Sequence, residues 1–350
     1  MTQTPLRDIL NSPCNIAYLG NSITAQKNSY CEILHAYLSA QYHEVGPAIK
    51  AAIGGVGSLA CNFMSDQLVI ARKPNICFIE CSAADMGGAT PIHFIEEAIE
   101  GLIKKLLDNN IFVIFLHLFR STSIYDSCLI LNKYQKIINK YQILSINVFN
   151  YIKSNYSDNS DKIVKDGIHT TPHGSLVYAK YIMHKIIPLL SSTMPVTQSK
   201  PLSLHPFIKT EISLPSKFLP QSFGAERHKL FRLTMPYVEI RLEEKIIHSS
   251  KDRHTIGFLF VADADCGVID VTNLNTREVY SIQLADRWCH TPRIQAAYFA
   301  LPIGPLTTIT LAPTLKNSTR HGANGQTTDY IQSGRSLKVI GMLEYIHNLI

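Results

Sequence analysis

Short apolar runs alternate with longer stretches of helical periodicity over residues 15–190, and this alternation limits the fold more than any other feature of the chain. Such alternation is typical of a parallel sheet whose strands are connected by helices on both faces. The predicted strands are 15–19, 48–53, 76–81, 112–118 and 143–149, and the clearest predicted helices are 30–42 and 92–107. The sequence therefore predicts a three-layer α/β/α domain.

The pattern changes after residue 190. Residues 191–220 are rich in serine, threonine and proline, which favours a linker or an extended crossing segment. Short runs rich in aromatic and β-branched residues follow at 231–242, 255–261, 268–271, 279–284, 294–301, 307–311 and 337–345. Such short, punctuated strands are typical of an antiparallel β-sandwich or jelly roll. We therefore predict three parts, which are a catalytic α/β domain at 1–192, a linker at 193–220 and a β-rich accessory domain at 221–350 with glycan binding as a candidate role.

Composition excludes several classes of protein. The chain has 350 residues, of which 46% are hydrophobic and 17% charged, so it has ample material for packed cores and is not a disordered chain. The net charge of +6 is modest, and no dense run of lysine and arginine predicts nucleic-acid binding. The longest apolar run, 111–119, is too short to span a membrane.

The eight cysteines form no Cys-x-x-Cys pair, which favours free thiols in a reducing compartment over a disulfide framework or a metal site. Residues 1–13 lack the charged start and continuous apolar core of a signal peptide. We therefore expect a cytoplasmic protein that uses no metal and no cofactor.

Two polar strings supply the side chains for nucleophilic catalysis. Residues 20–24 read Gly-Asn-Ser-Ile-Thr and follow the first predicted strand, so Ser22 lies where the strand gives way to a loop or helix. A serine hydroxyl needs an adjacent base and backbone N–H donors for the developing oxyanion. Asp166 and His169 are three residues apart, close enough for the carboxylate to orient the imidazole while its other nitrogen faces Ser22.

Further candidate site residues follow the other predicted strands. Ser22, Gly55, Ser82 and Arg120 each fall just beyond a strand, and ligands bind at the carboxyl ends of strands in a parallel sheet. We therefore expect these residues to share one rim. Arg120 offers a forked contact to a substrate carboxylate or phosphate, or else a surface ion pair. His117 is either a second substrate-binding residue or a buried histidine of the core.

The two strings resemble the first and last blocks of the SGNH (GDSL-like) hydrolase family, which read approximately Gly-Asp-Ser and Asp-x-x-His. The resemblance covers about the first half of the chain and implies a flavodoxin-like catalytic domain. It also implies that Ser22 is the nucleophile, His169 the general base and Asp166 its orienting partner. Residues 51–58 (Ala-Ala-Ile-Gly-Gly-Val-Gly-Ser) look like the family's glycine block, in which Gly55 matches the backbone donor that, with the Ser22 amide, forms the oxyanion hole.

One block departs from the family pattern. Residues 79–85 (Ile-Glu-Cys-Ser-Ala-Ala-Asp) occupy the place of a block that ends in Asn-Asp, and Ala84 stands where the asparagine is expected. An alanine side chain donates no hydrogen bond, and loss of one oxyanion donor typically lowers turnover about 100- to 1000-fold. Three interpretations follow: Ser82 or another side chain substitutes, the remaining backbone donors suffice, or the site is weakened or inactive.

The resemblance implies a serine esterase or acyltransferase that removes or transfers an O-acyl group, most simply acetyl, on a carbohydrate. A thioesterase or lipase substrate is an alternative, and a transferase would use an acyl donor such as acetyl-CoA. The hypothesis from a different class is a catalytically weakened SGNH-fold protein that binds carbohydrate or acts as a scaffold, and Ala84 is its motivation.

Overall fold

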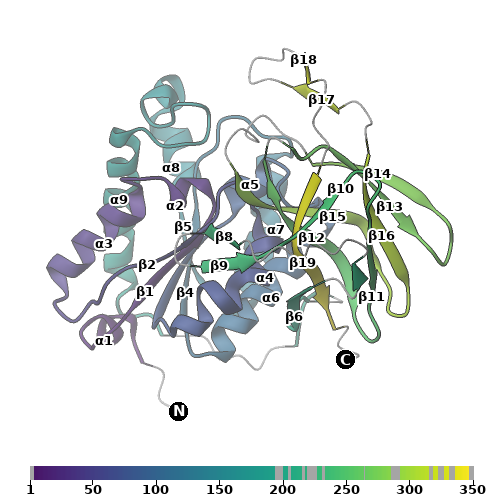
Figure 1. Cartoon of the computed structure of the whole chain (residues 1–350). Helices are drawn as coiled ribbons and strands as arrows, with labels where there is room; N and C mark the ends of the chain where they lie inside the picture. The colour runs from purple at the N-terminus through teal and green to yellow at the C-terminus, as the bar shows by residue number, and fades with distance from the viewer. Residues whose placement is uncertain are drawn as a thin grey trace. The chain divides into compact units, whose positions relative to one another are not determined.

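The computed structural model divides into two compact units, Met1–Ile208 and Lys209–Ile350, which are described separately (Figure 1). It describes the whole chain except residues 1–3, 194–199, 204–205, 215–216, 219–226, 231–232, 264, 285–291, 315–317, 322–326, 331–335 and 347–350.

A five-stranded parallel sheet forms the centre of the first unit, with the strand order β2-β1-β3-β4-β5. The strands are β1 (Ile16–Gly20), β2 (Ile49–Ala52), β3 (Ile76–Glu80), β4 (Phe112–His117) and β5 (Leu144–Asn147). Every residue of β1, β3 and β4 is buried, as expected for strands covered on both faces. The chain order reverses between β1 and β3, and such a switch point is where ligands bind in doubly wound sheets.

Helices cover both faces of this sheet, which confirms the predicted three layers (Figure 1). On one side α3 packs against α9, and on the other α4 and α7 pack against α6. The α-helices of the described part of this unit are α1 (Leu6–Leu10), α2 (Ser22–Ala25), α3 (Tyr30–Gln41), α4 (Ser58–Leu68), α5 (Ser82–Met86), α6 (Ile95–Asp108), α7 (Ser127–Tyr141), α8 (Val148–Asn155) and α9 (Pro172–Ile186). Short 3₁₀ turns occupy Ile70–Arg72, Ile92–Phe94, Ser157–Lys162 and Ile187–Leu189.

Two predicted elements end or begin differently from the structure. The strand predicted at 143–149 stops at Asn147, because the Asn147 side chain accepts a hydrogen bond from the Asn150 amide at 2.8 Å and starts α8 there. The helix predicted at 92–107 begins with a 3₁₀ turn, and its α-helical part starts at Ile95.

Part of the segment expected as a linker belongs to the first unit. The buried Glu100 carboxylate accepts hydrogen bonds from the Leu202 and Ser203 amides, both at 2.6 Å. Asn62 donates to the Phe207 carbonyl at 2.9 Å, and the Phe207 ring packs against other aromatic rings of the unit. These contacts join Leu202, Ser203 and Phe207 to α4 and α6.

Two antiparallel sheets form the second unit. The first has the order β10-β19-β12-β15 with β6 paired to β19, and the second has the order β14-β13-β16-β11-β7. The strands are β6 (Thr210–Ser213), β7 (Lys217–Phe218), β10 (Val238–Arg241), β11 (Ile246–Ser249), β12 (His254–Ala262), β13 (Val268–Asn273), β14 (Val279–Gln283), β15 (Arg293–Ile303), β16 (Thr308–Thr314) and β19 (Ser336–Tyr345). Two separate pairs are β8 (Arg227–Leu230) with β9 (Leu233–Pro236) and β17 (Ser318–His321) with β18 (Thr327–Tyr330).

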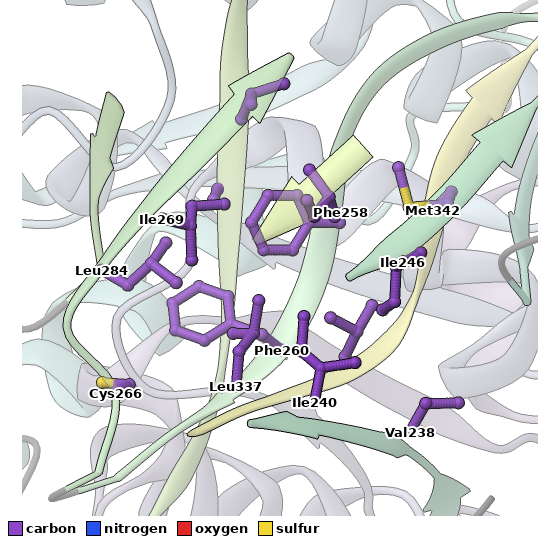
Figure 2. Packing of buried hydrophobic residues seen from close by; sticks show 14 of the residues in the cluster. Val238, Ile240, Ile246, Phe258, Phe260, Cys266, Ile269, Leu284, Leu337 and Met342 are labelled. Atoms are coloured by element: carbon purple, nitrogen blue, oxygen red, sulfur yellow. The ribbon is translucent and has the colours of Figure 1, made fainter. Parts of the chain in front are cut away.

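One apolar core joins the two sheets of this unit. Figure 2 shows Phe258 and Phe260 of β12 packed among side chains of the second sheet, including Ile246 of β11 and Ile269 of β13. Alternate residues of β12, which are Phe258, Phe260 and Ala262, belong to this core, and nearly every residue of β12 and β19 is buried. The predicted β-rich second half is therefore confirmed, although the run predicted at 231–242 contains two strands, β9 and β10. The strands β6, β7, β8, β11, β17 and β18 were not predicted.

Within the described ranges, no helix is long and apolar enough to cross a membrane. No group of three or more histidine, cysteine or acidic side chains in those ranges is placed to hold a metal ion. The seven cysteines there are free thiols, six of them buried, while Cys289 lies outside the described residues.

Candidate active site

Ser22 is the first residue of α2, directly after the carboxyl end of β1. Asn21 caps this short helix, because its side-chain oxygen accepts a hydrogen bond from the Ile23 amide at 3.0 Å. Gly20 permits the close packing of the turn, since a Cβ atom there would lie 2.5 Å from Thr24 Oγ1 and 2.9 Å from the Glu80 carbonyl oxygen. The turn therefore presents the half-buried Ser22 at the edge of the sheet.

His169 and Asp166 complete a chain of hydrogen bonds that starts at Ser22. The Ser22 Oγ lies 2.8 Å from His169 Nε2, and His169 Nδ1 lies 2.7 Å from Asp166 Oδ2. In the tautomer that this chain requires, the hydroxyl donates to Nε2 and the Nδ1 hydrogen is donated to the carboxylate. The structure therefore brings together a serine hydroxyl, an imidazole and a carboxylate in the order that a catalytic triad for acyl transfer would need.

The local turn holds Asp166 in place. Its Oδ1 accepts hydrogen bonds from the amides of Ile168 at 3.2 Å and His169 at 2.8 Å. Gly167 has a φ of +82°, and a Cβ there would lie 2.9 Å from Ser121 Oγ, so this position requires glycine. Burial raises the pKa of Asp166, but the hydrogen bonds and charge of His169, with the Ile168 amide, outweigh burial and lower it. The carboxylate is therefore ionised at neutral pH and can stabilise an imidazolium.

The loop between β2 and α4 passes beside Ser22. A Cβ atom built on Gly54 would lie 3.8 Å from the Ser22 Cβ, so the backbone at Gly54 approaches Ser22 closely. Gly55 follows with a φ of +81° and is exposed. The predicted glycine block therefore lies at Ser22, and the close neighbour Gly54 was not predicted, although the Gly-Gly pair was a signal for a tight backbone approach.

The short helix α5 carries Ser82 and Ala84. Ser82 is completely buried, and its Oγ has no hydrogen-bond partner among the described residues. Ala84 is 6% exposed. The buried Asp85 links α5 to its neighbours, since it accepts hydrogen bonds from the Ser58 amide at 3.0 Å and the Tyr134 hydroxyl at 2.7 Å. Burial raises the pKa of Asp85 despite these hydrogen bonds.

Arg120 and His117 have protein partners or protein surroundings. The Arg120 guanidinium donates to the carbonyls of Ala83, at 3.2 Å, and Thr122, and it lies against Gly87. His117 is 2% exposed, and neither ring nitrogen has a hydrogen-bond partner among the described residues. Burial lowers the pKa of His117 to about 4, so its ring is neutral at pH 7. Arg120 therefore braces α5 and the loop after β4, and His117 is a buried histidine in this structure.

Two further side chains support the site and were not predicted. Gln26, at the end of α2, donates to the carbonyl and hydroxyl oxygens of Thr170, the residue after His169. Glu80, the last residue of β3, accepts a hydrogen bond from Asn21 Nδ2 at 2.9 Å. A glutamate at the end of an otherwise apolar buried strand was the signal for the second contact.

No protein-family model matches the chain, and no curated protein matches it in sequence. Among solved structures, it is similar to a two-domain esterase active on acetylated mannans and co-crystallised with mannopentaose, with a TM-score of 0.74 and 13% identity over 99% of this chain and 94% of that one. A second crystal structure of a two-domain esterase active on acetylated mannans gives a TM-score of 0.72 and 13% identity over 97% and 93% of the two chains. An acetyl xylan esterase matches 49% of this chain and 99% of its own, with 18% identity and a TM-score of 0.44.

At this identity, the full-length match describes the fold. It covers both units and agrees with the parallel sheet of the first and the antiparallel sheets of the second. The chain therefore has the two-domain fold of that esterase, with a three-layer α/β/α unit first and a β-rich unit of antiparallel sheets after it.

Proposed function

We propose that this protein is a serine esterase that removes an O-acyl group, most simply acetyl, from a carbohydrate. The observation that carries the proposal is the hydrogen-bond chain from Ser22 Oγ to His169 Nε2, at 2.8 Å, and from His169 Nδ1 to Asp166 Oδ2, at 2.7 Å. The substrate class comes from the esterase of the same two-domain fold, which is active on acetylated mannans.

In the proposed mechanism, Ser22 Oγ attacks the ester carbonyl carbon while His169 Nε2 takes the hydroxyl proton. Collapse of the tetrahedral intermediate breaks the bond to the sugar oxygen, which receives that proton and leaves as an alcohol. A water molecule then attacks the acyl-serine, with His169 again as the base, and the acid is released. Asp166 remains ionised throughout and stabilises the protonated imidazole.

The oxyanion hole of this mechanism is built mainly from backbone. The Ser22 amide is at the start of α2, where backbone N–H groups have no partner within the helix. The Gly55 amide belongs to the exposed loop beside Ser22, and the left-handed turn at Gly55 sets its direction. Ser82 is the third proposed donor, but it is completely buried, whereas Ser22 is half-buried and Gly55 exposed. We therefore assign the main part to the two amides.

An acyltransferase would use the same three side chains and differ only in the acceptor. A sugar hydroxyl would then replace water after acyl transfer from a donor such as acetyl-CoA. The binding or scaffold hypothesis rests on Ala84, because its side chain offers no donor at the position where the family pattern has asparagine. Labelling and product analysis distinguish the three hypotheses.

The test compares the protein with the Ser22→Ala variant. The control variant is Ser12→Ala, which changes an exposed serine just after α1. Each is treated with a fluorophosphonate probe, with p-nitrophenyl acetate and with acetylated manno-oligosaccharides. We expect labelling and acetate release from the unchanged protein and Ser12→Ala, and neither from Ser22→Ala. Equal, negligible labelling of all three would refute the esterase and transferase hypotheses and favour a binding protein. Labelling with acetyl transfer to a sugar but no free acetate would identify a transferase.

A further inference from the structure

Glu80 is a buried carboxylate that faces the nucleophile segment from the neighbouring strand. It is the last residue of β3, and it is completely buried. Its Oε1 accepts a hydrogen bond from Asn21 Nδ2 at 2.9 Å, and its Oε2 is 3.4 Å from both the Asn21 amide and Thr24 Oγ1. All three donors belong to the segment that carries Ser22.

The contact with Glu80 fixes which way the Asn21 side chain points. Because the Asn21 amide nitrogen donates to Glu80, its oxygen is the atom that faces the Ile23 amide, which donates to it at 3.0 Å. Asn21 thus links Glu80 to the residue after Ser22. Its backbone N–H and its side-chain Nδ2 donate to Glu80, and its side-chain Oδ1 accepts from the Ile23 amide. Without an acceptor at Glu80, either end of the amide could face Ile23, and the cap would be lost in one of the two orientations.

The surroundings explain why the partner of Glu80 is an amide. Burial raises the pKa of Glu80 to about 7, although hydrogen bonds from Asn21 and Thr24 partly offset it. The other ionisable groups that interact with Glu80 are acidic: Asp85 of α5, Tyr30 of α3 and Tyr178 of α9, with Cys81 next in the chain. An aspartate at position 21, as in the Gly-Asp-Ser pattern, would place a second carboxylate directly against Glu80.

We propose that Glu80 is a positioning residue for the nucleophile, holding Asn21 so that Ser22 Oγ stays in line with His169 Nε2. This inference rests on the proposed role of Ser22. On this proposal Asn21 and Glu80 act as a pair, because the hydrogen bond between them needs an amide on one side and a carboxylate on the other. Exchanging the two groups between the positions preserves that relationship, because a glutamine at 80 can donate to an aspartate at 21, which still accepts from Ile23.

The experiment is a cycle of Glu80→Gln, Asn21→Asp and the double variant. Glu100→Gln is the matched control, since Glu100 is also a buried glutamate that accepts several hydrogen bonds but lies at the α6 contact with residues 202–203. Fluorophosphonate labelling rate, kcat and KM are measured for each, together with the thermal midpoint. Hydrogen exchange of the peptide that contains Ile23 is measured by mass spectrometry as a readout that needs no activity.

We expect each single variant to lower kcat and the labelling rate about 10- to 100-fold, as for loss of a hydrogen bond to a charged group, with KM little changed. The double variant should recover to within about threefold of the unchanged protein. Glu100→Gln should keep its kcat, even if its thermal midpoint falls. Exchange at Ile23 should be faster in both single variants and return toward normal in the double variant.

Two results would overturn the inference. One is a Glu80→Gln protein with unchanged kcat and unchanged Ile23 exchange. The other is a folded double variant as impaired as the product of the two single effects, which would show only additive structural damage. If the unchanged protein is not labelled at all, the proposed function fails, and the exchange measurements still decide whether Glu80 orders the Ser22 turn.

Discussion

His169 Nε2 lies 2.8 Å from Ser22 Oγ, although 147 positions separate the two residues in the chain. The parallel sheet accounts for this contact. Ser22 begins α2 just after β1, and His169 is on the loop that precedes α9. Since α9 packs against α3, the next long helix after Ser22, the two loops lie close together. The side chain of Gln26 then joins the two loops directly through Thr170.

Replacing Asp166 with asparagine should cause a large loss of turnover. The amide cannot stabilise the imidazolium and favours the wrong tautomer of His169, an effect of about 10,000-fold on kcat in the serine-protease triad. We expect a fall of at least about 1000-fold in kcat for Asp166→Asn with little change in KM. The control is His173→Gln, which changes the nearby histidine in the first turn of α9 and should leave kcat within about twofold of normal. A similar loss in both variants would contradict the assignment of His169 as the base.

Ala84→Asn should raise turnover on activated esters. The substitution restores an amide donor at the position where the family pattern has one, and a single oxyanion donor is worth about 100- to 1000-fold in other enzymes. Because the surrounding residues did not evolve with an asparagine, we expect a smaller gain of about tenfold in kcat. Ala84→Leu adds a side chain of similar size without a donor and should not raise kcat. A gain in both variants, or in neither, would show that position 84 does not face the oxyanion.

The two neighbouring glycines should respond differently to alanine. Gly55 has a φ of +81°, which is strained for a residue with a Cβ, and the cost is on the order of 1 kcal/mol. Gly54→Ala places its methyl 3.8 Å from the Ser22 Cβ, an ordinary contact distance. We expect Gly55→Ala to lower both the thermal midpoint and kcat, and Gly54→Ala to keep its thermal midpoint. Equal thermal midpoints for the two variants would argue against the left-handed turn at Gly55.

The buried His117 should make the protein less stable in acid. Its pKa is lowered to about 4 in the folded state, so the unfolded state binds more protons below an ordinary pKa of about 6.5. The stabilisation from keeping the ring neutral is therefore present above pH ~6.5 and is lost as the pH falls towards about 4. Glu80 acts in the opposite sense, because its raised pKa of about 7 makes its contribution decrease as the pH rises from about 4.5 to about 7.

The pH dependence of stability in the His117→Phe variant separates the contribution of His117 from those of the other titratable groups. We expect the free energy of unfolding of the variant minus that of the unchanged protein to be about 2 kcal/mol larger at pH ~4.5 than at pH ~7.5, because the variant has no buried imidazole to protonate. Urea denaturation at the two pH values measures it. The same difference at both pH values would mean that His117 does not titrate between the folded and unfolded states.

The fold class could be predicted because buried parallel strands are continuous apolar runs, and these are visible without knowing their neighbours. The boundaries depended on side-chain contacts, as at Asn147, whose capping bond stops β5. In the second half, β11 was missed because Ile246–Ser249 is a run of only four residues, two of them polar, with no clear punctuation. It is a strand because β16 and β7 pair with it on both sides.

The candidate site divides in the same way. Ser22, Asp166 and His169 belong to short strings whose residue types already suggest chemistry, so each could be selected from its local sequence. Glu80 could not be paired with Asn21, which is 59 positions away, because register between β1 and β3 decides that contact. The surroundings of Arg120 and His117 also depend on packing, and their assignment to substrate binding stays a prediction.

The contacts of Leu202, Ser203 and Phe207 with the first unit affect how the protein can be dissected. A fragment that stops at residue 192 would leave the Glu100 carboxylate without its two backbone donors and the aromatic surface around Phe63 without Phe207. A fragment that continues to Ile208 retains both. Anyone isolating the α/β half for crystallisation or screening should therefore place the cut after Ile208 and not at the end of α9.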